Sequence, residues 1–380
     1  MITLKVDGIR SNSATSDAIT LASDGTCTAK ITNNLSNRNL IINGAMQVAQ
    51  RGTSFNQAAD ASYTLDRFAV FRNGAGIMDI EQSTTVPSGK GFKKSLKCTV
   101  DTADSSMGGA DFGGLYHKIE GQDINQFEFG NSSAKQFTLS FWVRSNITGT
   151  YSVAFRNGSA NRYLVKEYTI SSADTWQKIT ITDTADTTGT WATDNTTGLQ
   201  INWCLWEGGF TAAPNTWGTG NIVGSSNNVN WAATVGNTFY ITGIQLELGS
   251  ISTDYEFRSI AQELALCQRY YRVLLDNTGG TNAGDFGVGL YYTSSYFMWN
   301  VYCTPEMRAT PALDCTSGSN LYRFYRNNGY DSMDDFTFNN GTKRHVRLVN
   351  SSDASGTAGQ SGILHISVTT DAIIALKAEL

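Results

Sequence analysis

Hydrolytic chemistry at neutral pH would depend on the three histidines of this 380-residue sequence, His117, His345 and His365, because histidine is the usual base beside a serine or cysteine nucleophile. None of them lies in a nucleophile-elbow motif, and no Gly-x-Ser-x-Gly sequence occurs. His365 alternates with apolar residues in "ILHISV", which is typical of a strand residue with satisfied hydrogen bonds. We therefore predict no catalytic residues, and we expect that the protein is not an enzyme.

Metal binding and carboxylate catalysis need side chains that lie close together. The six cysteines are spread along the chain without a Cys-x-x-Cys pair, so we predict free, buried thiols and no metal site. A glycosidase needs two carboxylates about 5–10 Å apart, and the sequence does not pair its 33 acidic residues. The adjacent Asp334 and Asp335 suit a turn or a calcium-binding loop equally. No cofactor is predicted, and a structural calcium ion stays open.

Glycan recognition would use flat aromatic rings beside neutral polar groups. Trp142 and Trp206 each lie on the polar side of a strand whose other side is apolar, in "QFTLSFWVRS" and "NWCLWE". Both are candidate glycan-binding residues, and the alternative is that they pack under a loop or against a neighbouring subunit. Three tryptophans in loops rich in Gly, Thr and Asn have the same two interpretations: Trp191, Trp217 and Trp231.

A second set of candidates lies in the tyrosine-rich region near the end of the sequence. Tyrosine, serine, glycine and asparagine form adaptable binding surfaces, because they combine contact area with a small loss of conformational entropy. The glycan-binding candidates of this region are Tyr292, Tyr296, Trp299 and Tyr330.

Composition excludes two further classes of function. The net charge is −5 and the isoelectric point about 5.3, so the basic excess of a nucleic-acid-binding protein is missing. The densest basic run, residues 343–347, is interpreted as a solvated strand face. No signal-peptide pattern is present, and no apolar run approaches the roughly 18 residues of a membrane-spanning helix. We expect neither nucleic-acid binding nor membrane insertion.

The elements that must position the candidate residues are predicted to be strands. Clusters of Gly, Asn, Asp and Ser separate short segments in which apolar residues recur at every second position. In "QFTLSFWVRS", one face carries Phe137, Leu139, Phe141 and Val143. Many short strands without helical segments between them predict an antiparallel sandwich. Residues 38–258 suit one two-sheet jelly roll with long loops.

Two shorter regions flank this block. Residues 1–37 hold the pair Asp24-Gly25 between two alternating runs, which predicts a hairpin. A segment of this length cannot bury a core alone, so the arm must pack against the rest of the chain or a partner. Residues 273–380 return to strand patterns and are predicted to form a second, smaller β-sandwich. The predicted fold class is therefore all-β.

One connecting helix is predicted at residues 259–272. Ser259 is a suitable N-cap, and Gln262 is its capping-box partner. An apolar stripe follows at helical spacing, formed by Ile260, Leu264, Cys267 and Tyr271. The stripe fits docking on the chain's own sandwich and packing around the axis of a trimer equally well, and the sequence does not decide between them.

Three parts of the sequence together resemble tail fibre proteins of tailed bacteriophages. "NRNLIINGAMQVAQRGTS" (37–54) and "YTLDRFAV" (63–70) resemble the start of a carbohydrate-binding-module-like jelly roll in such fibres, and residues 241–271 resemble its end with an exit helix. "MRATPAL" (307–313) and the closing "AIIALKAEL" resemble the C-terminal domain that follows it. The N-terminal "LKVDGI" and "AITLASDGT" are similar to short attachment arms of fibres from marine phages.

The resemblance implies a virion structural protein, a homotrimeric tail fibre assembled in the host cytoplasm. It implies attachment to other phage tail proteins through residues 1–37 and contact of the distal domains with a host surface glycan or outer-membrane receptor. Two alternatives stay open, a tailspike-type polysaccharide depolymerase and a head fibre or adaptor protein without host contact. No receptor and no set of binding residues comes with the resemblance.

Overall fold

The fold is all-β, which confirms the predicted fold class. The structure is a computed structural model that describes residues 6–21, 23, 27–29, 37–279, 284–366 and 371–380. Besides strands, the described residues form two α-helices and two 3₁₀ turns: α1 (Gly121–Ile124), α2 (Ile260–Gln268), η1 (Asn125–Phe127) and η2 (Trp231–Ala233). No helix in these ranges is long and apolar enough to cross a membrane.

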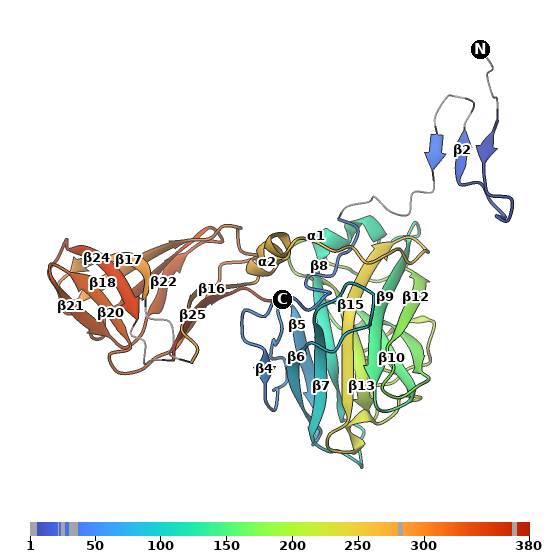
Figure 1. The fold of residues 1–380 in the computed structure, drawn as a ribbon, viewed down its shortest axis with the longest axis horizontal. Coiled ribbons are helices and arrows are strands. Elements are labelled where there is room, and N and C mark those ends of the chain that lie inside the picture. Colours follow the sequence, from blue (N-terminus) through green and yellow to red (C-terminus); the bar gives the residue numbers. More distant parts are fainter. Residues whose placement is uncertain (1–5, 22, 24–26, 30–36, 280–283, 367–370) are drawn as a thin grey trace.

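The first sandwich consists of two six-stranded antiparallel sheets (Figure 1). The sheet named here β14–β5 has, in spatial order, β14 (Trp217–Thr219), β11 (Arg162–Ile170), β10 (Gly149–Asn157), β13 (Thr197–Glu207), β8 (Phe112–Glu120) and β5 (Phe68–Asn73). The sheet named β12–β4 has β12 (Gln177–Thr184), β9 (Gln136–Ser145), β15 (Thr238–Leu248), β7 (Ser95–Thr102), β6 (Ile77–Ser83) and β4 (Ser54–Phe55).

The core of this sandwich lies between its two sheets. As predicted from the two-residue period, Phe137, Leu139, Phe141 and Val143 of β9 are all buried. They belong to one apolar cluster with Trp203 of β13, on the opposite sheet. Alternation along each strand therefore fixes which side chains form the core and which face outward.

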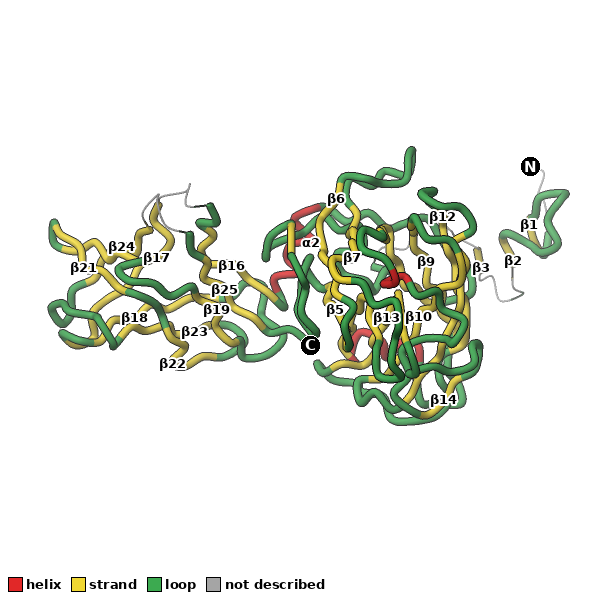
Figure 2. Tube along the Cα trace, turned by 90° about the horizontal axis from the view of Figure 1, so that it is seen from below, coloured by secondary structure: helices red, strands yellow, loops and turns green. Residues whose placement is uncertain are grey.

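The distal sandwich packs a three-stranded sheet against a seven-stranded one. The smaller sheet has β16 (Tyr271–Asp276), β25 (Ile373–Lys377) and β19 (Ala312–Cys315). The larger sheet has, in spatial order, β21 (Gly329–Met333), β20 (Tyr322–Arg326), β24 (Ser361–Ile366), β17 (Gly284–Thr293), β18 (Tyr296–Tyr302), β23 (His345–Asn350) and β22 (Thr337–Gly341). This sandwich projects from one side of the first in both views (Figure 1, Figure 2).

The N-terminal region forms a small sheet of its own. It contains β1 (Gly8–Ile9), β2 (Ile19–Leu21) and β3 (Cys27–Ala29), and β2 pairs with β3 in antiparallel fashion. The predicted Asp24-Gly25 turn lies outside the described residues. Figure 1 draws this sheet on the far side of the first sandwich from the distal one.

Helix α2 begins where the sequence predicts but ends earlier. Ser259 is the N-cap, and its hydroxyl accepts a hydrogen bond from the Gln262 N–H at 3.3 Å. The helix ends at Gln268, because Tyr271 already pairs with Lys377 as the first residue of β16. The predicted helical end at residue 272 is therefore wrong, since the first strand of the distal sandwich begins before it.

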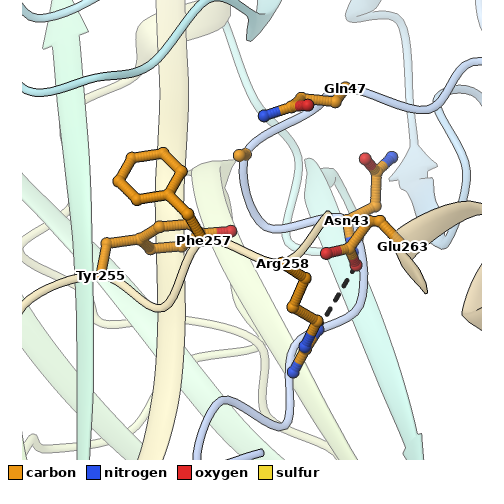
Figure 3. A pocket seen from close by; sticks show the side chains of 7 residues that line it. Asn43, Gln47, Tyr255, Phe257, Arg258 and Glu263 are labelled. Atoms are coloured by element: carbon orange, nitrogen blue, oxygen red, sulfur yellow. Dashed lines mark hydrogen bonds and ion pairs between the residues drawn. The ribbon is translucent and has the colours of Figure 1, made fainter. Parts of the chain in front are cut away.

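The helix docks on the chain's own first sandwich. The Glu263 carboxylate accepts hydrogen bonds from the Asn43 N–H at 2.5 Å and from Arg258 at 3.4 Å (Figure 3). The neighbouring cavity encloses about 10 Å³, which is at the lower limit for a single water molecule. Cys267 is fully buried, whereas Ile260 is 55 % exposed. One side of the helix is thus used by the chain itself.

A network of ion pairs and ring contacts joins the two sandwiches. Arg67 is 1 % exposed, pairs with Glu379, and lies 3.5 Å from the centroid of the Tyr270 ring. Arg51 pairs with the same carboxylate at 2.7 Å and covers the Tyr271 ring at 3.6 Å. A buried arginine between an acid and an aromatic face is held in one orientation, so this junction fixes how the distal sandwich meets the first.

A carboxylate of the first sandwich makes a second set of contacts at the junction. Glu120 accepts two hydrogen bonds from Arg269, at 2.7 and 2.9 Å, and one from the Tyr270 hydroxyl at 2.5 Å. Glu120 is fully buried, and a bidentate arginine pair is the strong geometry for a carboxylate. The segment after α2 is therefore tied to β8.

Candidate functional site

Trp206 does not present a ring to solvent, contrary to the prediction. A β-bulge interrupts the pairing of β13 with β8 between Cys204 and Trp206, and it turns both Leu205 and Trp206 into the core. The ring is 0 % exposed and stacks on Trp231 at 6.0 Å. Gly113 makes the space, because a Cβ there would come within 2.0 Å of the ring. Strict alternation fails here, so Trp206 is no longer a candidate.

Trp142 lies on the outer face of the β12–β4 sheet, as predicted. It is half-buried, with Lys178 and Thr242 opposite on the neighbouring strands. The Lys90 ammonium lies 5.6 Å from the centroid of the ring, a distance that allows a cation–π contact. Trp142 therefore keeps an outward position, as the sequence predicts.

Trp299 is also buried, because β18 alternates. Phe297, Trp299 and Val301 point into the distal core, and Tyr296 lies on the opposite side of the strand. A Cβ on Gly287 would come within 2.8 Å of the Trp299 ring, so this glycine makes room for it. Trp299 therefore packs in the core of the distal sandwich and is no longer a glycan-binding candidate.

The three remaining distal candidates lie on the outer face of the seven-stranded sheet. Tyr292 is 67 % exposed and meets Tyr296 edge to face at 6.4 Å. Tyr330 is 52 % exposed and packs beside Tyr325 at 5.4 Å. With the exposed Val288, these side chains form what we call the tyrosine face. The strands of Tyr292 and Tyr330 are three apart in the sheet, about 14 Å. The strand register also places Tyr330 level with Val288, four residues before Tyr292, so the structure does not unite the two tyrosines in one pocket.

The turns beside the tyrosine face are held together by hydrogen bonds. Arg326 donates to Asp331 at 2.5 and 3.0 Å and to Gln360 at 2.6 Å. The Tyr291 hydroxyl donates to the same Asp331 at 3.0 Å, and the Gly356 N–H donates to the Ser294 carbonyl at 2.7 Å. These bonds order a surface that would otherwise lose entropy on binding a ligand.

Sequence analysis missed a row of polar side chains on the outer face of the β14–β5 sheet. Arg156 of β10 is paired with Tyr163 of β11 on one side and with Gln200 of β13 on the other, and Gln200 is paired with Lys118 of β8. Residues directly opposite one another in a sheet share a face. We call these four residues the polar row: Tyr163, Arg156, Gln200 and Lys118.

Buried polar atoms without partners lie at and beside the polar row. Asn202 is 0 % exposed, and its oxygen accepts a hydrogen bond from Gln200 at 2.8 Å. Among the described residues, its Nδ2 has no partner, and neither has the Nε of Arg156. Buried donors of this kind are costly unless they bind something, so this face has unused hydrogen-bonding capacity.

Residues 208–230, the segment between β13 and η2 that includes the short strand β14, cover part of this face. We call this segment the loop after β13. The Arg156 Nη2 donates to the Asn221 side chain, and Ser225 bonds to Glu167 of β11. Further along the sheet, Phe210 and Val223 of the loop pack with Ala69, Phe71, Tyr116 and Cys204. The loop brings neutral groups to the polar row, and no acidic side chain bonds to Arg156 in the described structure.

The electrostatics of the polar row are those of partly buried cations. Burial lowers the pKa of Arg156 from its ordinary value, with no acidic group to offset it. Burial also lowers the pKa of Lys118, as do the nearby Arg67 and Arg156, whereas Glu379 raises it. A desolvated cation binds an anion more strongly than an exposed one does, because water screens it less.

A cavity at the junction is a weaker candidate. It has a volume of about 590 Å³ and is lined in part by Arg51, Tyr63, Tyr271, Arg308 and Glu379. The size suits a small ligand, but Arg51 already covers the Tyr271 ring. The Tyr63 hydroxyl donates to the Leu380 oxygen at 2.9 Å. These groups hold the two sandwiches together.

No group of three His, Cys, Asp or Glu side chains is arranged to hold a metal ion in the part of the chain that the structure describes. Asp334 accepts a hydrogen bond from the Asn320 N–H at 2.7 Å, which favours the turn interpretation of this residue. His365 bonds to Asp285 at 3.0 Å, as expected of a satisfied strand residue. The free cysteines Cys98, Cys204, Cys267 and Cys303 are buried, as predicted, whereas the free Cys315 is only half-buried. The side chain of Cys27 is outside the described residues.

Comparisons with known proteins return distant structural similarity only. No protein-family model and no curated protein matches this sequence. The enzymatically active domain of tailspike protein 4 of bacteriophage CBA120 is 13 % identical with a TM-score of 0.31, over 56 % of this chain and 21 % of that one. A structure titled "CBM4 structure and function" is 14 % identical with a TM-score of 0.31, over 55 % and 98 %.

A third similar structure is a family 11 carbohydrate-binding module of a Clostridium thermocellum cellulase, 11 % identical with a TM-score of 0.29, over 52 % of this chain and 97 % of that one. At such identities and TM-scores the similarity is not sufficient to assign a function to this chain.

Proposed function

We propose that this chain is a non-enzymatic virion protein, a tail fibre of a tailed bacteriophage that contacts glycans on the host surface. The observation that carries glycan contact is the polar row, together with the unpartnered nitrogen of Asn202 beside it. Saccharide hydroxyls both donate and accept hydrogen bonds, and amide side chains are suited to both roles. An ordered outer sheet face with amides, cations and a tyrosine is suited to this chemistry.

Tyr163 is the aromatic member of the polar row. Its ring packs on Gly218 of β14, where a Cβ would come within 2.4 Å of the ring. The ring therefore packs against the neighbouring strand while the side chain stays half-buried. A tyrosine fixed in this way loses little entropy when a sugar packs on it.

The fibre assignment rests on the sequence resemblance and agrees with the order of the parts. The N-terminal sheet, the first sandwich and the distal sandwich follow one another along the molecule (Figure 1). We propose that residues 1–37 attach to other tail proteins, that three chains form a homotrimer, and that the tyrosine face makes a second contact with the host. The protein would then reside in the virion tail.

A glycan array tests the central claim. Purified bacterial surface polysaccharides are arrayed and probed with the full chain, with Tyr163→Ala/Gln200→Ala, and with Tyr292→Ala/Tyr330→Ala as the matched distal pair. We expect binding to at least one polysaccharide and an affinity loss of tenfold or more for the polar-row pair. Failure of the wild-type chain to bind any polysaccharide or host cell would favour the head-fibre or adaptor alternative.

Two measurements on the same samples address the remaining claims. Reducing ends released from a bound polysaccharide would contradict the non-enzymatic assignment and favour a depolymerase. Native mass spectrometry at micromolar and nanomolar concentrations should give a trimer that persists on dilution. A stable monomer would contradict the trimeric fibre. It would not affect the claim of glycan contact, which the glycan array tests separately.

A further inference from the structure

Arg156 differs from the other buried arginine of the described chain. Arg67 and Arg156 are the two buried arginines among the described residues, at 1 % and 7 % exposed. Arg67 has the Glu379 carboxylate as its partner. The Nε of each arginine lacks a hydrogen-bond partner among the described residues. They differ in that Arg156 bonds to the neutral Asn221 side chain and pairs with no carboxylate in the described part of the chain. A buried guanidinium is thus left without a counter-charge.

Such an arrangement does not favour folding. Transfer of a cation out of water is costly unless an anion or a full set of hydrogen bonds compensates for it. The neighbouring strands offer Tyr163 and Gln200 directly opposite Arg156, and both are uncharged at neutral pH. Nearby Arg162 shows what full pairing looks like, because Asp186 accepts from its Nε at 2.6 Å and from its Nη2 at 2.9 Å. The missing partner of Arg156 therefore has to come from outside the chain if the charge is to be compensated.

We propose that the glycan bound at the polar row carries an anionic substituent, such as a uronic acid carboxylate, and that this substituent binds the Arg156 guanidinium. The inference rests on the proposed function of the same face and adds the chemical class of its ligand. Guanidinium groups bind planar carboxylates with two parallel hydrogen bonds, and the free Nε is one of the donors for that geometry.

Lys118 extends the site along the row. It lies two strands from Arg156, with Gln200 between them, so their backbones are about 10 Å apart. Its ammonium donates one hydrogen bond, to the Leu380 oxygen at 2.9 Å, and an ammonium has three donors. A saccharide that crosses Gln200 meets a cation at each end, which favours acidic over neutral polymers.

The test compares a polysaccharide with its own neutral form. The acidic polysaccharide with the strongest array signal is treated with carbodiimide and borohydride, which converts its carboxylates to primary alcohols. We expect the wild-type chain to bind the reduced polymer at least tenfold more weakly. Arg156→Gln should bind both forms with the same low affinity. Arg144→Gln, which removes the same charge from the outer face of the other sheet, should retain the wild-type preference.

The outcomes separate this inference from the proposed function. Equal binding of acidic and reduced polymers by the wild-type chain, or a wild-type preference in Arg156→Gln, would overturn the role of Arg156 and leave glycan contact standing. Absence of binding to every polysaccharide would instead overturn the proposed function.

A second measurement needs no glycan. If Arg156 is retained for a ligand, Arg156→Met should fold with an unchanged or raised Tm, because an apolar side chain of similar length can replace an uncompensated buried charge without loss. A fall in Tm of several degrees, or failure to fold, would show that Arg156 supports the loop through Asn221, and the inference would be abandoned.

Discussion

The outer face of the β14–β5 sheet differs from that of the seven-stranded sheet in the side chains it carries and in how far they are covered. In both sheets alternate side chains point away from the core. On the β14–β5 sheet the polar row lies beside an apolar cluster, and the loop after β13 partly covers both. On the seven-stranded sheet the outward side chains are mostly tyrosines and aliphatics that stay exposed, including Val288 at 71 % and Tyr292 at 67 %.

The comparison indicates that a covering loop changes which interactions a sheet face can make with a ligand. Under a loop, water is excluded, so a charge such as that of Arg156 interacts strongly with an anion. On an open sheet charges are screened, and contact area from tyrosine rings contributes most. We therefore expect a selective contact at the polar row and a broader, weaker contact at the tyrosine face.

Glu379→Ala should cause a large loss in the free energy of unfolding of the covered region. The covered face depends on the distal sandwich, because Glu379 compensates the buried Arg67 beside β5. In Glu379→Ala that charge is left unpaired, which costs about 3–5 kcal/mol. Chemical denaturation followed by tryptophan fluorescence measures it, since seven of the eight tryptophans precede the distal sandwich.

The control for Glu379→Ala is Glu306→Ala. Glu306 pairs with Arg344, whose side chain is 80 % exposed, so the loss should stay within about 1 kcal/mol. Equal losses in the two variants would mean that the junction is not a stabilising unit and that the covered face is independent of the distal sandwich.

A pH change should affect the first sandwich through His117. This residue is 0 % exposed and packs against Phe68 with the ring centroids 5.1 Å apart. Burial holds its pKa well below the ordinary value. The unfolded chain binds a proton near pH 6.5 that the folded chain does not, so stability is complete above pH 6.5 and falls as the pH decreases below it. Between pH 6.5 and 5 the loss is about 2 kcal/mol.

The free energy of unfolding at several pH values checks this prediction. In His117→Phe the decrease between pH 6.5 and 5 should become smaller by the same amount. If the free energy of unfolding of this variant decreases with pH as steeply as that of the wild type, the pH dependence comes from other groups. The predicted role of His117 in the stability of the first sandwich would then be wrong.

The smallest effects on stability are expected on the tyrosine face. Tyr292→Ala and Tyr330→Ala remove exposed rings, so each should change the free energy of unfolding by no more than about 0.5 kcal/mol. Tyr291, the next residue along β17, is 0 % exposed, and Tyr291→Ala should cost about 3–5 kcal/mol. Thermal or chemical denaturation compares them. A large loss in Tyr292→Ala would mean that the open face is part of the folded core.

Local sequence patterns predicted the elements well, because their physical causes are local. The two-residue period of β9 identified its buried face, and the capping residues at Ser259 identified the start of α2. The end of the helix was missed, since Tyr271 is held in β16 by its pairing with Lys377, more than a hundred residues away in the sequence. Similarly, the bulge that buries Trp206 exists only in the pairing of β13 with β8.

The sequence by itself therefore determined an all-β chain with one capped helix. It named Tyr292, Tyr296, Trp299 and Tyr330 together as glycan-binding candidates, and only the structure separated the exposed Tyr292 and Tyr330 from the buried Trp299. Only the tertiary structure decided which side chains meet. The polar row takes one residue from each of four strands, and Arg67 meets Glu379 across 312 positions. Register between strands and docking of one sandwich on another depend on packing of the whole chain, and no periodicity within a short segment contains that information.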